Sequence, residues 1–193
     1  MLRGLYDWTM RLAAHERARL ALFLVAFVES SFFPIPPHAM LVPMVLADRA
    51  RAWWLATLTT IGSVLGGLAG YAIGYFLYES VGRRVLELYG YTEKFALFAA
   101  QYNDYGAWIV FFAGVTPFPY KVITIASGVT QLNVAVFMVA SIIARALVFF
   151  VIAALLYWFG PPIRAFIERR LGLVATVFTI MLFAGFAAIR LFV

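Results

Sequence analysis

The chain has 193 residues, of which 65% are hydrophobic and only 12% are charged. This composition leaves too little polar surface for an ordinary water-soluble domain. The net charge is +6, but the basic residues flank apolar runs and form no stripe interleaved with aromatic residues, which argues against nucleic-acid binding. The absence of cysteine excludes disulfides and thiolate metal ligands. We therefore predict an all-α integral membrane protein.

The apolar runs predict one membrane domain over residues 1–193. At roughly 20 residues per crossing, they hold several embedded segments. The predicted parts are an interfacial helix at 1–17, a first repeat at 18–79, an amphipathic linker at 80–104, a second repeat at 105–160 and a C-terminal transmembrane helix at 171–193. A signal peptide is the alternative for the start, but no small-residue cleavage site follows the first apolar run, so we expect the N-terminus to be retained.

Two segments are long enough to span. Residues 52–79 begin with Trp53 and Trp54 and end near Tyr78, which places an aromatic belt at each end. Residues 133–159 form the second span, which we expect to end at the Gly-Pro-Pro of residues 160–162. In the first span, glycines recur every four residues and form a smooth helix face: Gly62, Gly66, Gly70 and Gly74. Ordinary close packing explains this face, and we expect its partner to be a hairpin of the same repeat.

Two Pro-x-Pro segments interrupt apolar runs, "FFPIPPHAM" at 32–40 and "VTPFPYKVI" at 115–123. The prolines are Pro34, Pro36, Pro37, Pro117 and Pro119. A shift of 83 residues superimposes the two patterns and the long span after each. Proline stops a helix, and the freed backbone groups then need protein or water as partners, because lipid tails offer none.

The helical pieces on either side of each break are too short to cross the membrane comfortably. They predict two re-entrant hairpins, with a kinked single span as the alternative. A hairpin makes no net crossing and the span after it makes one, so the two repeats would be inverted, a recurring plan of transporters. This topology puts nine cationic residues on one side and four on the other, which predicts a cytoplasmic N-terminus. The nine are Arg3, Arg11, Arg17, Arg19, Arg49, Arg51, Arg164, Arg169 and Arg170, and the four are Arg83, Arg84, Lys94 and Arg190.

Four ionisable residues lie within apolar runs: Glu29, His38, Lys121 and Arg145. A charged side chain at the centre of a span costs roughly 2.5 to 3.5 kcal/mol, so pairing or a wet cavity is implied. We expect these residues to line a common site for a proton or an anionic headgroup. The alternatives are a purely structural pair of Glu29 and Arg145, and a Lys121 that extends to the interface. Hydroxyls that would support the site are Thr116, Thr124 and Ser127.

The segments "FVESSFFPIPP", "GSVLGGLAGYAIGY" and "GVTPFPYKVITIASG" resemble the DedA family, also called the VTT or SNARE-associated Golgi protein domain, and within it the short YqaA-like branch. The resemblance covers about residues 20–170. It implies two re-entrant hairpins with inverted pseudo-symmetry and movement of lipids between leaflets. By position, Glu29 matches the membrane acid of the family, and Lys121 stands near its second hairpin arginine. Thr116 occupies roughly the place of the other arginine, and lysine is a point charge and not a bidentate fork.

The leading hypothesis is a lipid transporter or scramblase of the bacterial inner membrane. Its partners would be phosphate-bearing lipid headgroups, namely phospholipids or a polyprenyl phosphate. Transport would be coupled to protons through Glu29. The protein could assemble as a homo-oligomer. A proton-coupled transporter of a small soluble ion and a non-transporting membrane scaffold are the alternatives. We expect no enzyme, no metal site and no cofactor, because the chain has no Gly-x-Ser-x-Gly motif and only two histidines, His15 and His38.

Overall fold

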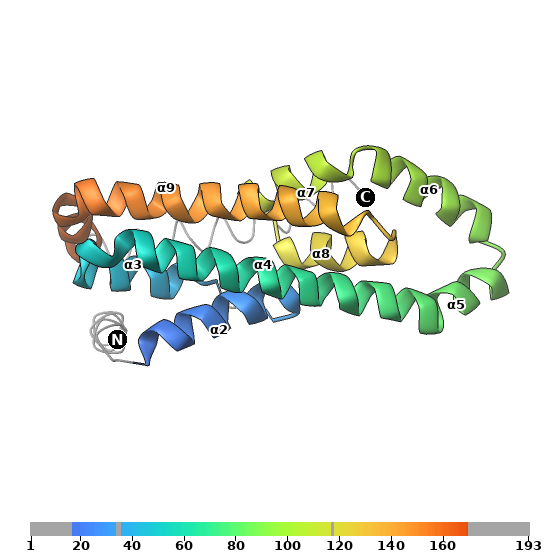
Figure 1. Cartoon of the computed structure of the whole chain (residues 1–193), viewed down its shortest axis with the longest axis horizontal. Helices are drawn as coiled ribbons and strands as arrows, with labels where there is room; N and C mark the ends of the chain where they lie inside the picture. The colour runs from blue at the N-terminus through green and yellow to red at the C-terminus, as the bar shows by residue number, and fades with distance from the viewer. Residues whose placement is uncertain (1–16, 34–35, 117, 170–193) are drawn as a thin grey trace.

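The structure is a computed structural model that describes residues 17–33, 36–116 and 118–169. All regular structure in these residues is helical, in agreement with the predicted all-α class (Figure 1). Two helices of the described part are long and apolar enough to cross a membrane, Arg49–Leu88 and Val134–Gly160. The predicted C-terminal helix at 171–193 lies outside the described residues, as do Pro34, Pro117 and all of the predicted interfacial helix except Arg17.

Both Pro-x-Pro segments separate two short helices. In the first, α2 (Ala18–Ser31) ends before the prolines and α3 (His38–Ala47) begins after them. In the second, α7 (Gly106–Val115) and α8 (Tyr120–Val129) are separated in the same way. Thr116 is extended, with φ −93° and ψ 167°, because a residue that precedes proline is sterically kept out of the α conformation. The predicted helix breaks are confirmed.

Each pair of short helices starts and finishes at one end of the bundle. One hydrophobic cluster joins Ala18 at the start of α2 to Leu46 at the end of α3. A second cluster joins Val110 in the first half of α7 to Leu132, just after α8. Each pair is therefore folded back on itself, and we call residues 18–47 the first hairpin and residues 106–129 the second hairpin.

The two hairpins pack on two long helices, α4 (Ala52–Leu77) and α9 (Val134–Arg169). These long helices contact each other and run antiparallel along the bundle (Figure 1). In the first hairpin, α2 packs mainly on α4 and α3 on α9; in the second, α7 packs mainly on α9 and α8 on α4. Each long helix therefore packs against the first helix of the hairpin that precedes it in the sequence and against the second helix of the other hairpin.

The glycine face of α4 carries both hairpins. A Cβ atom at Gly66 would collide with the backbone carbonyl of Phe27 on α2, and one at Gly62 would also meet an α2 carbonyl. A Cβ atom at Gly74 would collide with the carbonyl of Ile125 on α8. The expected partner, a hairpin of the same repeat, is thus right for Gly62 and Gly66 but wrong for Gly74. The reason is that α4 is long enough to reach past the first hairpin to the second.

Beyond α4 the helix continues further than the predicted end at Glu79. A π-helical stretch, Tyr78–Gly82, leads into α5 (Arg83–Leu88). Gly90 then adopts φ 69°, a left-handed conformation that glycine reaches without steric cost. After this turn α6 (Thr92–Asp104) leads back towards the bundle (Figure 1). The segment predicted as an amphipathic linker is thus two helices joined by a tight turn.

The predicted end of the second span is confirmed, because the long helix α9 is broken by a kink at Phe159 and its apolar span ends at Gly160. Asn133 caps its start, because Oδ1 accepts hydrogen bonds from the backbone N–H groups of Ala135 and Val136, at 2.9 and 3.3 Å. Phe159 leaves the helical conformation (φ −111°, ψ 16°), but helix resumes and continues to Arg169. Prolines just after the kink stand in the first turn of the resumed helix, where no N–H donor is needed.

Candidate functional site

The two hairpins meet beside the glycine face of α4. The hydroxyl of Thr124 on α8 donates a hydrogen bond to the backbone carbonyl of Ser30 on α2, at 3.1 Å. Gly70 of α4 lies at this junction, where a Cβ atom would collide with the Thr124 hydroxyl. The end of α2 and the middle of α8 are thereby brought together in the interior of the bundle, where Ser30 and Thr124 are both fully buried.

A buried ion pair connects the first hairpin to α9. Arg145 Nη2 lies 3.3 Å from Glu29 Oε2, and the two side chains are only 7% and 17% exposed. Each residue is the lone charged side chain in its apolar run, so pairing offsets part of the cost of burying either charge. The structure therefore pairs Glu29 with Arg145, a contact that both the predicted common site and its alternative, a structural pair, allow.

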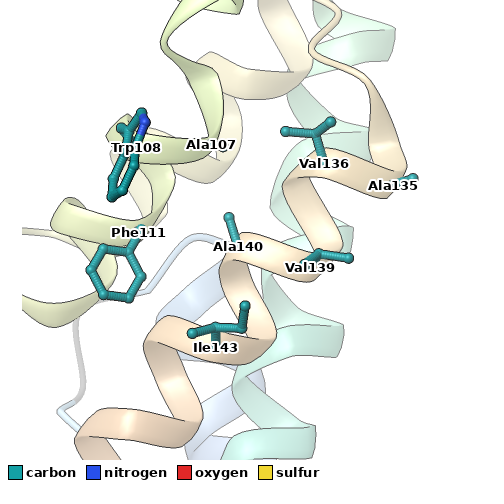
Figure 2. A pocket seen from close by; sticks show the side chains of 8 residues that line it. All are labelled: Ala107, Trp108, Phe111, Ala135, Val136, Val139, Ala140 and Ile143. Carbon is teal, nitrogen blue, oxygen red and sulfur yellow. The ribbon is translucent and has the colours of Figure 1, made fainter.

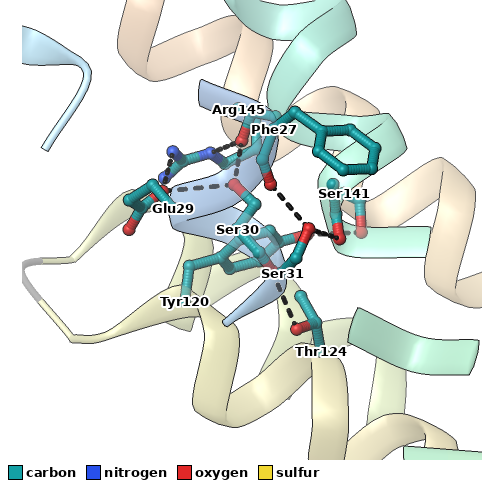
Figure 3. A network of polar contacts seen from close by, with 10 residues as sticks. Phe27, Glu29, Ser30, Ser31, Tyr120, Thr124, Ser141 and Arg145 are labelled. Carbon is teal, nitrogen blue, oxygen red and sulfur yellow. Dashed lines mark hydrogen bonds and ion pairs between the residues drawn. The ribbon is translucent and has the colours of Figure 1, made fainter. Parts of the chain in front are cut away.

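The guanidinium of Arg145 is held by polar contacts (Figure 3) and by two aromatic rings. Its Nε donates a hydrogen bond to Ser63 Oγ at 2.6 Å. Its Cζ lies 4.9 Å from the ring centroid of Tyr120 and 4.7 Å from that of Phe149. Tyr120 is itself fixed, because its hydroxyl donates to Ser141 Oγ at 2.5 Å. Aromatic rings attract the cation and restrict its rotation.

Two serines complete a ring of contacts between Glu29 and Arg145. Ser30 Oγ donates to Glu29 Oε2 at 3.2 Å and lies 2.7 Å from Ser63 Oγ. Both serines are fully buried. Neighbouring Ser31 is also buried, but its hydroxyl bonds only to the backbone carbonyls of Phe27 and Gly66, so it stands outside the ring.

The other two predicted site residues are not joined to this ring by hydrogen bonds. The His38 ring packs against the Phe149 ring at 5.4 Å between centroids, on the aromatic side chain that also contacts Arg145. Lys121 is half-buried in the first turn of α8, beside Tyr120. Within the described residues neither His38 nor Lys121 forms an ion pair. The structure thus assembles the predicted site in part.

The three predicted supporting hydroxyls have different surroundings. Thr124 bonds to the Ser30 carbonyl and to the Lys121 carbonyl. Ser127 Oγ lies 3.0 Å from the hydroxyl of Tyr102 on α6. Burial raises the pKa of Tyr102, against a smaller opposing effect of this hydrogen bond, so its hydroxyl stays protonated. Thr116 is exposed at the break of the second hairpin.

The donor set gives little basis for a metal site. No group of three His, Asp or Glu side chains that could hold a metal ion occurs in the part of the chain that the structure describes. Glu29 is the sole acidic member of the ring, and its carboxylate is already bound by Arg145 and Ser30. This arrangement is a charge pair with attached hydroxyls.

Residues 33–158, more than half of the chain, match the VTT domain family. The chain belongs to the VTT domain family, also called DedA. An uncharacterised protein of Haemophilus influenzae is 35% identical to this VTT protein over 170 residues, 88% of each chain. An uncharacterised HI0703 homologue of Histophilus somni is 31% identical over 161 residues, 83% of this chain and 84% of that protein. No solved structure matches.

This membership confirms the predicted family. Because proteins of the VTT domain family are membrane proteins, this chain is one as well. The matched region contains His38, Lys121 and Arg145 and begins four residues after Glu29. Assignment to the YqaA-like branch stays a prediction.

The sequence did not indicate three residues that form the ring or contact Arg145, namely Ser30, Ser63 and Tyr120. A serine within an apolar helix fits the pattern of a small packing residue, so Ser63 is inconspicuous inside the glycine-rich face. One signal was available, because Ser63 follows Thr59 by one turn on α4, and both lie on its buried side. A polar line within an apolar helix indicates a polar partner inside the bundle.

An apolar groove lies between α7 and α9 (Figure 2). It has a volume of about 600 Å³. Its lining residues are Ala107, Trp108, Phe111, Ala135, Val136, Val139, Ala140 and Ile143. None of its lining residues belongs to the ring, and Ile143, two residues before Arg145, points to a different side of α9.

Proposed function

We propose that this protein moves a phosphate-bearing lipid, a phospholipid or a polyprenyl phosphate, between the leaflets of the bacterial inner membrane. The observation that carries the proposal is the buried guanidinium of Arg145 at the junction of the two hairpins. Arginine recognises phosphate with its planar fork of N–H donors, and such charge-assisted bonds are the strong ones. A headgroup that crosses hydrocarbon alone meets the full cost of a buried ion, which a fixed cation in the protein lowers.

The proposed topology treats both hairpins as re-entrant and the two repeats as inverted. The fold-back of each hairpin and the exchange of contacts with antiparallel α4 and α9 support it. The hairpins start from opposite ends of α4, because Ala52 packs with the ends of the first and Tyr71 with the ends of the second. The excess of arginine on the side of the N-terminus supports a cytoplasmic N-terminus.

In this proposal the headgroup passes the interior cations while the acyl or prenyl tail stays in the bilayer. Lys121 supplies a second cation, which is half-buried and forms no ion pair with any described residue. The groove between α7 and α9 offers an apolar surface for the tail. The partners are therefore membrane lipids, and the proposal assigns the protein no chemical reaction, cofactor or metal.

One observation favours a second candidate function. The Glu29 and Arg145 side chains satisfy each other's charge in the closed ring, as a purely structural pair in a membrane scaffold would. A transporter of a small soluble ion is the third candidate and would use the same residues without a lateral path for lipid.

Reconstitution separates these functions. Purified protein is placed in liposomes that carry a fluorescent phospholipid or a polyprenyl phosphate in both leaflets. The fraction of the inner-leaflet pool that becomes accessible to an external quencher or enzyme is measured, with and without a proton gradient. We expect faster exposure than in empty liposomes. Equal rates with and without protein, for both lipids, would refute lipid movement and leave the scaffold or, if a soluble ion is carried, the ion transporter.

A further inference from the structure

The ring between Glu29 and Arg145 has a defined direction. Arg145 Nε can only donate, so Ser63 Oγ accepts its hydrogen. Ser30 donates its single hydroxyl hydrogen to Glu29, so in the contact of 2.7 Å between the serines Ser63 is the donor. The hydrogen bonds therefore run from Arg145 through Ser63 and Ser30 to Glu29, and the direct ion pair closes the ring.

The hydrogen bonds of this ring use only one edge of the Arg145 guanidinium. Nε bonds to Ser63 and Nη2 to Glu29, whereas no described residue accepts a hydrogen bond from Nη1. Tyr120 and Phe149 hold the plane of the group. The serines hold its edge, and both are 0% exposed, so water has little access to replace a lost bond.

We infer that Ser63 and Ser30 are positioning residues that hold Arg145 and Glu29 so that the Nη1 end of the guanidinium meets the phosphate of a lipid headgroup. This inference rests on the proposed function. It differs from a general packing role because the two hydroxyls bond to side chains of the site and to each other. Ser31, one residue further along α2 and equally buried, bonds only to backbone carbonyls and is the natural comparison.

The test compares Ser63→Ala and Ser30→Ala with the control Ser31→Ala. Each variant is purified, checked as a single folded species by size-exclusion chromatography, and reconstituted in liposomes. Two fluorescent probes with the same acyl chains are followed, a phospholipid and a glycolipid without phosphate. We expect both ring variants to lose phospholipid movement about tenfold to a hundredfold, the scale of a lost hydrogen bond to a charged group. The glycolipid rate should not change, and Ser31→Ala should keep the wild-type preference for phosphate.

A second expectation concerns additivity. Because the two serines belong to the same chain of hydrogen bonds, the Ser30→Ala/Ser63→Ala double variant should lose little more phospholipid movement than either single variant. Ser63→Thr, which keeps the hydroxyl, should restore part of the preference for phospholipid. Should Ser63→Ala not yield folded protein, Ser63→Thr and Ser30→Ala carry the comparison with Ser31→Ala.

The outcomes separate the inference from the proposed function. If the wild-type protein moves phospholipid but ring variants and Ser31→Ala lose the same amount for both probes, the serines are packing residues and the inference is wrong while the proposed function stands. If the wild-type protein accelerates neither probe, the proposed function fails and the inference falls with it.

Discussion

Replacing Arg145 by alanine removes the positive half of a buried ion pair. Glu29 Oε2 lies 3.3 Å from the guanidinium, and exposures of 7% and 17% leave little solvent to screen the pair. Removing one partner of a buried pair costs about 3 to 5 kcal/mol, because the remaining charge has no counterpart. For a chain of this length the same loss lowers the melting temperature by about 6 to 20 °C.

The assay is thermal unfolding in detergent micelles, with the folded fraction measured by size-exclusion chromatography. The double variant Glu29→Gln/Arg145→Met replaces the pair by neutral side chains of similar volume and should melt closer to the wild-type protein than Arg145→Ala does. Arg83→Ala is the matched control, since its ion pair with Glu87 spans 3.4 Å with side chains 64% and 56% exposed. Such surface pairs contribute about 0 to 1 kcal/mol.

The reasoning would be refuted if Arg145→Ala melted as the wild-type protein does, or if the neutral double variant were no better than Arg145→Ala. The double variant also separates function from structure. Loss of phospholipid movement in a double variant of normal stability would assign the pair to the lipid path, whereas full movement would assign it to the scaffold.

Other predictions follow from the packing and the charges. Gly66→Val should abolish the folded species in size-exclusion chromatography, because its Cβ collides with an α2 carbonyl, whereas in Gly82→Ala the new Cβ meets chiefly the side chain of Tyr78 and should be tolerated. Lys121→Ala should slow phospholipid movement with little change in melting temperature, because this side chain forms no ion pair in the described part of the chain; unchanged movement would remove Lys121 from the path. Single cysteines in Arg19→Cys and Arg49→Cys should react with an impermeant thiol reagent from the same side of the membrane, and labelling from opposite sides would exclude a re-entrant first hairpin.

Local chemistry in the sequence determined the class of the protein and the places where its helices break. An apolar composition requires a membrane, and Pro-x-Pro stops a helix whatever surrounds it, so the ends of α2 and α7 follow from nearby residues alone. The contact between Glu29 and Arg145 was predictable for a similar reason, because two opposite charges isolated in apolar runs are costly apart. Similarity of the motifs supplied the family.

The limits of local reasoning are visible in the long helices. Gly-Pro-Pro at 160–162 marks the end of the apolar span, as predicted, but the same prolines also fit the first turn of a new helix, and after a kink at Phe159 a further helical segment continues to Arg169. Likewise the span predicted to end at Glu79 continues through a π-helical stretch to Leu88. At both places the same residue pattern is compatible with two backbone conformations, and the pattern alone does not select between them.

Tertiary structure alone decided which side chains share the site. Ser63 lies 82 residues from Arg145 in the sequence, and no periodicity within α4 or α9 indicates that their side chains meet at 2.6 Å. The sequence likewise does not indicate that the glycine face packs against Phe27 of the first hairpin at one end and against Ile125 of the second hairpin at the other. A smooth helix face admits any closely packed backbone, and a buried hydroxyl accepts any donor within reach. Their partners are therefore set by how the two hairpins and two long helices pack in space.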